Sequence, residues 1–107
     1  MNQVITKETQ CLGSLDRIPV GEGRQFRIGD TTIAVFRSRE GNVYATQAEC
    51  PHRQGRLADG LNGGTTLVCP LHGWKFNMAT GDALLGDCAI KTYRAWTDDA
   101  GDVWVEL

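Results

Sequence analysis

Cys50-Pro51-His52 and Cys69-Pro70-Leu71-His72 are the two stretches from which the structure of this chain can be inferred. They hold both of its histidines and half of its four cysteines. Sixteen residues separate His52 from Cys69. Each stretch offers one thiolate and one imidazole, so the pair makes a Cys2His2 set that can hold a metal ion or an iron–sulfur cluster. The candidate ligands are therefore Cys50, His52, Cys69 and His72.

The rest of the chain has the pattern of an all-β protein. Most segments alternate apolar and polar residues with a period of two and end at turns rich in glycine, of which there are 13. One short helical turn is predicted at Ser14–Pro19, with Ser14 as its cap. Turns are also expected at Gly29-Asp30, at 39–42, at 80–82 and at 98–101. The predicted strands are Gln10–Leu12, Arg24–Ile28, Thr31–Phe36, Val43–Thr46, Thr65–Cys69, Lys75–Asn77, Ile90–Ala95 and Val103–Glu106.

Length and composition limit the possible functions. With 107 residues, the chain predicts a single domain, residues 1–107, that can bury a core without disulfides. A net charge of −2 gives no reason to expect nucleic-acid binding, and no stretch approaches the roughly 20 apolar residues that span a bilayer. Residues 1–8 lack the pattern of a secretory signal, and four cysteines in that context indicate thiol or metal chemistry in a reducing compartment. We therefore expect a cytoplasmic protein.

Charge is distributed unevenly along the chain. Residues 17–56 carry seven arginines and four acidic residues, whereas residues 82–107 carry six acidic residues and two basic ones. A surface with two signs could orient a protein partner by electrostatic steering. The alternative is scattered charge that contacts solvent.

Three further segments near the candidate ligands add to the evidence from the ligand spacing. His72-Gly73-Trp74-Lys75-Phe76 is followed by Thr80-Gly81, and Leu57-Ala58-Asp59-Gly60 lies between the two ligand stretches. In these segments, and in its Cys-x-His and Cys-x-x-His spacing, the chain resembles the Rieske iron–sulfur proteins over nearly its whole length.

This resemblance implies a fold, a cofactor and a set of ligands. The fold would be an antiparallel β barrel or sandwich with a small inserted cluster-binding subdomain, here at about residues 47–84. The cofactor would be a [2Fe–2S] cluster, with Cys50 and Cys69 on one iron and His52 and His72 on the other. The alternative for the same four ligands is a zinc-stabilised interaction module without redox function.

Departures from the family bear on the reduction potential. High-potential members have a disulfide between the two loops, and a serine and a tyrosine that donate hydrogen bonds to cluster sulfurs. This chain has Gly55 and Leu71 at the disulfide positions, and Trp74 and Phe76 where the donors would be. Fewer donors stabilise the reduced state less, so we expect a potential near the low end of the Rieske range, about −150 mV.

The resemblance also implies a one-electron carrier without catalytic residues of its own. Once His52 and His72 bind the cluster, no histidine is left for the mononuclear iron of a ring-hydroxylating oxygenase. Two functions stay open. One is a ferredoxin between a flavin-dependent NAD(P)H reductase and a Rieske oxygenase. The other is the small subunit of an assimilatory NAD(P)H nitrite reductase, and residues 50–53 and 87–93 resemble segments of that small subunit. Its partner would be the large subunit of the reductase.

Cysteines and tryptophans outside the ligand set are predicted to serve packing. Cys11 and Cys88 are expected to be small buried hydrophobes. Trp96 and Trp104 are expected in the core, because they lie in or beside apolar strands. Trp74 follows the second ligand stretch and is expected to shield the cluster from water.

Overall fold

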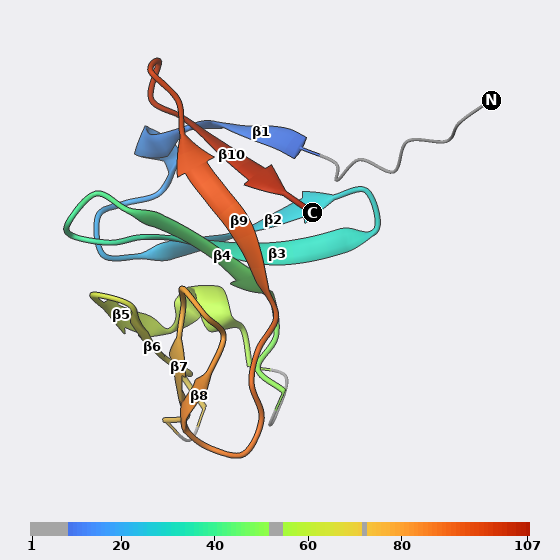
Figure 1. The fold of residues 1–107 in the computed structure, drawn as a ribbon, viewed down its shortest axis with the longest axis vertical. Coiled ribbons are helices and arrows are strands. Elements are labelled where there is room, and N and C mark those ends of the chain that lie inside the picture. Colours follow the sequence, from blue (N-terminus) through green and yellow to red (C-terminus); the bar gives the residue numbers. More distant parts are fainter. Residues whose placement is uncertain (1–8, 52–54, 72) are drawn as a thin grey trace.

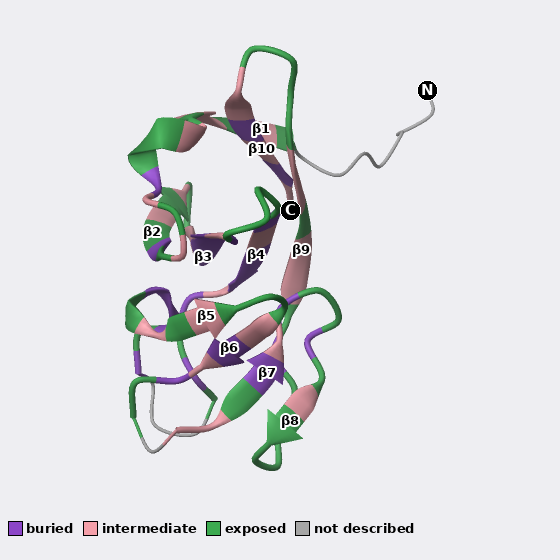
Figure 2. Ribbon diagram, turned by 90° about the vertical axis from the view of Figure 1, so that its left-hand side faces the viewer, coloured by how far each residue is buried: buried purple, intermediate pink, exposed green. Residues whose placement is uncertain are grey.

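Six strands form one antiparallel sheet that curls into a nearly closed barrel (Figures 1 and 2). The computed structural model describes residues 9–51, 55–71 and 73–107. The strand order is β1-β10-β9-β4-β3-β2, so β1 and β2 form the two edges of this sheet. The strands are β1 (Thr9–Ser14), β2 (Gly23–Ile28), β3 (Thr31–Arg37), β4 (Val43–Gln47), β9 (Thr92–Thr97) and β10 (Asp102–Glu106).

A second sheet of four short strands lies below the barrel in Figure 1 and between β4 and β9 in the sequence. All of its strand pairs are antiparallel, in the order β5-β6-β7-β8. The strands are β5 (Leu61–Gly63), β6 (Thr66–Val68), β7 (Lys75–Asn77) and β8 (Ala83–Leu85). The all-β class and the barrel with a smaller inserted sheet are therefore confirmed.

Strand β3 belongs to the six-stranded sheet, and its buried residues contribute to two separate cores. Its residues Ile33, Ala34, Val35 and Phe36 are all 0% exposed. Because successive side chains of a strand point to opposite faces, they contribute in turn to two cores. The barrel core consists of Ile18, Ile33, Val35, Ala45, Val103 and Val105. The lower core consists of Ala34, Phe36, Cys50, Leu57, Ala58, Leu67, Cys69, Phe76, Met78 and Ile90. Both candidate ligand cysteines thus belong to the lower core.

Two single turns of 3-10 helix complete the described elements. The predicted turn after Ser14 is present as η1 (Leu15–Arg17), and the Ser14 hydroxyl accepts a hydrogen bond of 3.1 Å from the Asp16 N–H. The second, η2 (Leu57–Asp59), precedes β5 and buries Leu57 and Ala58. Within the described ranges, no helix combines the length and the apolar character that crossing a membrane requires.

The sequence predicted eight of the strands and missed two. Strands β5 and β8 have no counterpart among the predicted strands. Strand β8 is Ala-Leu-Leu, which does not alternate, and β5 is Leu-Asn-Gly followed by a second glycine, which is typical of a turn. The strand expected from Ile90 begins instead at Thr92, because the Ile90 N–H donates to the Gly81 carbonyl and its side chain enters the lower core.

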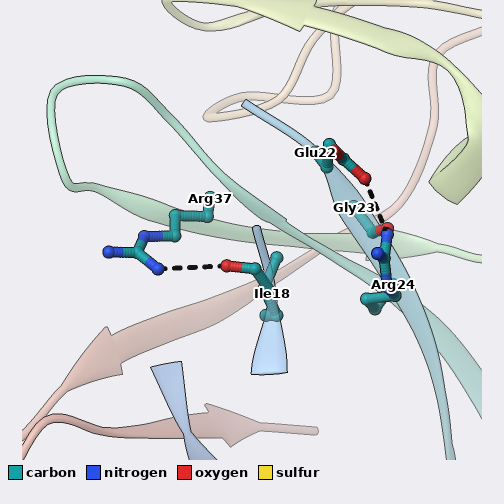
Figure 3. Close-up of polar contacts among 5 residues, drawn as sticks. All are labelled: Ile18, Glu22, Gly23, Arg24 and Arg37. Atoms are coloured by element: carbon teal, nitrogen blue, oxygen red, sulfur yellow. Dashed lines mark hydrogen bonds and ion pairs between the residues drawn. The ribbon is translucent and has the colours of Figure 1, made fainter. Parts of the chain in front are cut away.

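Several arginines of residues 17–56 form contacts within the barrel. Arg37 of β3 donates from Nη1 to the Ile18 carbonyl at 3.1 Å, which ties the segment after η1 to the sheet, as Figure 3 shows. Arg24 donates to the Gly23 carbonyl and to the Glu22 carboxylate in the same view. Arg17 lies 5.8 Å from the centroid of the Phe26 ring and so links η1 to the edge strand β2. Some of the arginines of residues 17–56 are therefore engaged in contacts within the molecule.

Candidate metal centre

Each candidate ligand cysteine begins a loop that a backbone hydrogen bond closes five residues later. The Cys50 N–H donates to the Gly55 carbonyl at 2.8 Å, and the Cys69 N–H donates to the Trp74 carbonyl at 2.7 Å. The first loop follows β4 and is flanked by an antiparallel bridge between Glu49 and Arg56. The second loop joins β6 to β7. The two loops, 50–55 and 69–74, therefore have the same backbone closure.

The structure brings the two cysteine side chains together. Cys50 is 1% exposed and Cys69 is 2% exposed, and neither forms a disulfide. Burial raises the pKa of the Cys69 thiol, the Leu71 N–H lowers it by donating to the sulfur, and the neighbouring Cys50 thiol raises it again. The sequence could not identify the Leu71 donor, because a backbone N–H leaves no mark in the residue pattern.

His52 and His72, the other two predicted ligands, lie outside the described residues. They fall within the two closed loops in the sequence, at the second position after Cys50 and the third after Cys69. Among the residues that the structure describes, no group of three His, Cys, Asp or Glu side chains could hold a metal ion. The described part of the site is therefore the pair of thiols, and the full ligand set stays a prediction.

Gly55 and Leu71 place the two loops in direct contact. A Cβ atom on Gly55 would lie 3.0 Å from Cγ and Cδ1 of Leu71 and 3.4 Å from Cys69 Sγ. Gly55 and Leu71, which stand where high-potential Rieske proteins have their disulfide, are thus neighbours in space. An apolar contact joins the loops there, and Leu71 still keeps 42% of its surface exposed.

Trp74 closes the second loop through its backbone carbonyl. Its side chain is partly buried against the lower core, which contains both cysteines. Its ring lies 6.4 Å from the ring of Phe76 at an interplanar angle of 54°. The side chain thus lies against the core that contains the cysteines, and its shielding of a cluster stays a prediction.

Trp96 and Trp104 were wrongly expected in the core. They are cross-strand partners in the β9–β10 pair, and neither packs against the described core clusters. Strand alternation gives the inner face of β10 to Val103 and Val105, which leaves Trp104 on the outer face. There its indole N–H donates to Asp98 at 2.8 Å, while Arg94 lies 5.0 Å from the centroid of the Trp96 ring.

Cys11 and Cys88 are also not where the sequence suggested. Both thiols are exposed instead of buried. Cys11 pairs with Trp104 across the β1–β10 ladder, so it shares the outer face of the barrel. Cys88 lies in the connection between β8 and β9. Neither belongs to the thiol pair of the ligand loops.

The chemistry of the paired thiols fits a thiophilic metal centre. Soft thiolate ligands suit zinc and iron–sulfur clusters, and a cluster of the [2Fe–2S] type takes two ligands on each iron. Cys50 and Cys69 supply one such pair from two loops of matching closure, within an apolar surround that excludes water.

Comparison with known proteins agrees with this geometry. The family described as the Rieske [2Fe-2S] domain matches residues 8–94. The ferredoxin component of the naphthalene 1,2-dioxygenase/salicylate 5-hydroxylase systems of Ralstonia sp is 38% identical over 81 residues, which are 74% of this chain and 77% of that protein.

Solved structures share the fold over most of the chain. A Mycobacterium tuberculosis protein assigned as an NADH-dependent nitrite reductase small subunit superposes with a TM-score of 0.86 over 94% of this chain and 96% of its own, at 20% identity. A chain from the complex of reduced oxygenase and oxidized ferredoxin in carbazole 1,9a-dioxygenase superposes with a TM-score of 0.77 over 90% of this chain and 99% of its own, at 27% identity.

Proposed function

This chain belongs to the Rieske [2Fe-2S] domain family, and on that premise we propose that it is a Rieske-type ferredoxin. In this role it receives single electrons from a flavin-dependent NAD(P)H reductase and passes them to a Rieske oxygenase. It acts as a component of an oxidoreductase system and has no catalytic site of its own. We place it in the cytoplasm, because all four cysteines lie in the described residues and none is paired in a disulfide.

A Rieske domain implies a Rieske-type cluster, and four residues are proposed to hold it. Cys50 and Cys69 would bind one iron as thiolates, and His52 and His72 would bind the other as neutral imidazoles. When bound, such a cluster accepts and releases one electron at a time. The rest of the chain positions these ligands: the loop closures hold the cysteine backbones, Leu71 donates its N–H to the Cys69 sulfur, and the lower core excludes water.

The observation that carries the proposal is the contact between two buried thiols from matching loops. A structural zinc finger would need the same four ligands, but the Cys-x-His spacing is unusual for one. The purified protein should therefore contain about two irons and two acid-labile sulfides per chain. One zinc and no labile sulfide would disprove the iron–sulfur assignment.

The oxygenase partner is supported by the relatives. The Ralstonia protein is a ferredoxin component of dioxygenase systems, and a chain with this fold is present in a complex between an oxygenase and its ferredoxin. We therefore favour a terminal oxygenase as the electron acceptor.

A nitrite reductase subunit is the second candidate. Its support is the superposition with the Mycobacterium tuberculosis protein, which covers almost all of both chains. At 20% identity this likeness concerns the fold, so it leaves the partner open.

Reconstitution separates the two candidates. The chain, loaded with its cluster, is mixed with a flavin reductase and NAD(P)H, and then with either an aromatic-ring oxygenase or a siroheme nitrite reductase. We expect substrate-dependent NAD(P)H consumption with the oxygenase, and none with any component left out. Stimulation of nitrite reduction alone would favour the second candidate, and no effect on either would contradict the carrier role.

A further inference from the structure

The backbone of Gly86 packs against the ring of Trp74. Gly86 follows β8 directly and has a φ of +123°, which disfavours residues with a side chain. A Cβ atom on it would lie 2.4 Å from Cδ2, 2.5 Å from Cε3 and 2.9 Å from Cε2 of Trp74. All three atoms belong to the six-membered ring of the indole, so the contact can be kept only by glycine.

Trp74 connects this contact to the ligand loops. Its carbonyl accepts the Cys69 N–H and closes the second loop, while its side chain packs on the lower core that contains both cysteines. The next residue, Lys75, pairs with Leu85, the last residue of β8. The β7–β8 ladder thus places Gly86 beside Trp74, whose side chain contacts both Gly86 and the lower core.

We propose that Gly86 is a positioning residue that holds the Trp74 indole against the lower core, which contains both ligand cysteines, and thereby lowers the reduction potential of the cluster. This inference rests on the proposed function, since it requires a redox centre at Cys50 and Cys69. An added electron makes the centre more negative, and a charged state is disfavoured where apolar groups replace water. The cover formed by the indole therefore opposes reduction, and β8 controls that cover from outside the ligand loops.

The test is the midpoint potential of the purified, cluster-loaded protein, measured by voltammetry without any partner. Gly86→Ala should displace the indole and favour the reduced state by about tenfold, which is a positive shift of about 59 mV for one electron. Trp74→Ala should give a shift of the same sign and similar size. The double variant should shift no further than Trp74→Ala, because no indole is left for the new methyl group to displace.

Gly41→Ala is the matched control. Gly41 also has a positive φ, +93°, but a Cβ atom on it would meet nothing within 4 Å. The Gly41→Ala variant therefore has a similar backbone cost but no contact with a ring. The midpoint potential of this variant should equal that of the wild type.

A further variant keeps the test decisive if Gly86→Ala does not retain its cluster. Trp74→Phe leaves the backbone alone and removes part of the ring, so it should shift the potential in the same direction. Unchanged potentials in Trp74→Phe and Trp74→Ala would overturn the proposal, as would additive shifts in the double variant. Such a result would leave the carrier role intact, whereas a wild-type chain without an iron–sulfur spectrum would overturn both.

Discussion

The side-chain amide of Asn62 is buried, and neither its oxygen nor its nitrogen has a hydrogen-bond partner among the described residues. Asn62 pairs with Leu67 in the β5–β6 ladder, and directly paired residues project from the same face of a sheet. Because Leu67 is 0% exposed in the lower core, the amide also faces inward. A buried polar group without a partner costs about 1–3 kcal/mol.

Asn62→Leu should therefore stabilise the protein. We expect the free energy of unfolding to rise by about 1 kcal/mol, measured as a higher Tm in thermal unfolding. Asn77→Leu is the matched control in the same sheet, because its Oδ1 accepts the N–H groups of Ala79 and Thr80. It should lower the Tm. A loss in Asn62→Leu as large as that of the control would mean that the amide binds an ordered water.

Gly55→Ala should destabilise the two ligand loops. Its methyl group would lie 3.0 Å from Leu71 Cγ, so the Leu71 side chain must move by a few tenths of an ångström and the contact between the loops is strained, at a cost of about 1–3 kcal/mol. Adding Leu71→Ala should recover most of that loss, since the crowding partner is then gone. Thermal unfolding and the visible absorbance retained by the cluster report both effects.

Gly63→Ala serves as the control for this pair, because a Cβ atom there would meet nothing within 4 Å. Should Gly55→Ala behave like Gly63→Ala, the loops would not be held by this contact.

At the scale of elements, the β9–β10 hairpin is organised by Asp98. Its carboxylate accepts hydrogen bonds from the Ala100 N–H at 2.9 Å, the Asp102 N–H at 3.0 Å and the Trp104 indole at 2.8 Å. These donors favour the charged form, with the Trp104 indole first among them, and they hold the pKa of Asp98 below its usual 3.8. The hairpin is therefore stabilised by an ionised Asp98.

Trp104→Phe should raise the pKa of Asp98 toward its ordinary value, as followed by NMR titration of the carboxyl carbon. A lowered folded-state pKa contributes stability above the unfolded pKa of about 3.9, and that contribution is lost as the pH falls through the folded-state value. Asp98→Asn should remove this part of the acid dependence of the Tm. Trp96→Phe, its cross-strand neighbour, should leave the Asp98 titration unchanged, and an equal shift in both variants would contradict the assignment.

For the molecule as a whole, the important feature is that two cores share one strand but only one of them contains the ligand cysteines. The barrel core has no cysteine, whereas Cys50 and Cys69 are part of the lower core. Metal binding and local folding are coupled when ligands lie in a core, because the site does not exist in the unfolded chain. The two halves should therefore respond differently to loss of the cluster.

Cys50→Ser should abolish the cluster and loosen the small sheet while the barrel persists. We expect the amides of β6 and β7 to lose most of their protection from hydrogen exchange, and those of β9 and β10 to keep theirs. Cys88→Ser, which removes an exposed thiol, should change neither the optical spectrum nor the exchange. Uniform loss of protection in Cys50→Ser would show that both cores unfold as one unit.

Features with a local signal were predictable from the residues. Alternation with a period of two identified every strand of five or more residues and also β6 and β7, and Ser14 marked the turn that it caps. The spacing of Cys50 and Cys69 relative to the histidines by itself indicates a metal centre. Each of these signals is contained within a few neighbouring residues, where backbone preference and side-chain direction act together.

Features that depend on pairing between distant segments became visible only in three dimensions. The outward positions of Cys11 and Trp104 follow from the register of β1 against β10. The contacts of Gly55 with Leu71, and of Gly86 with Trp74, join loops that are separate in sequence. A residue pattern states which groups alternate along one strand, but the face that is covered depends on which other strand packs there, and that depends on the whole chain.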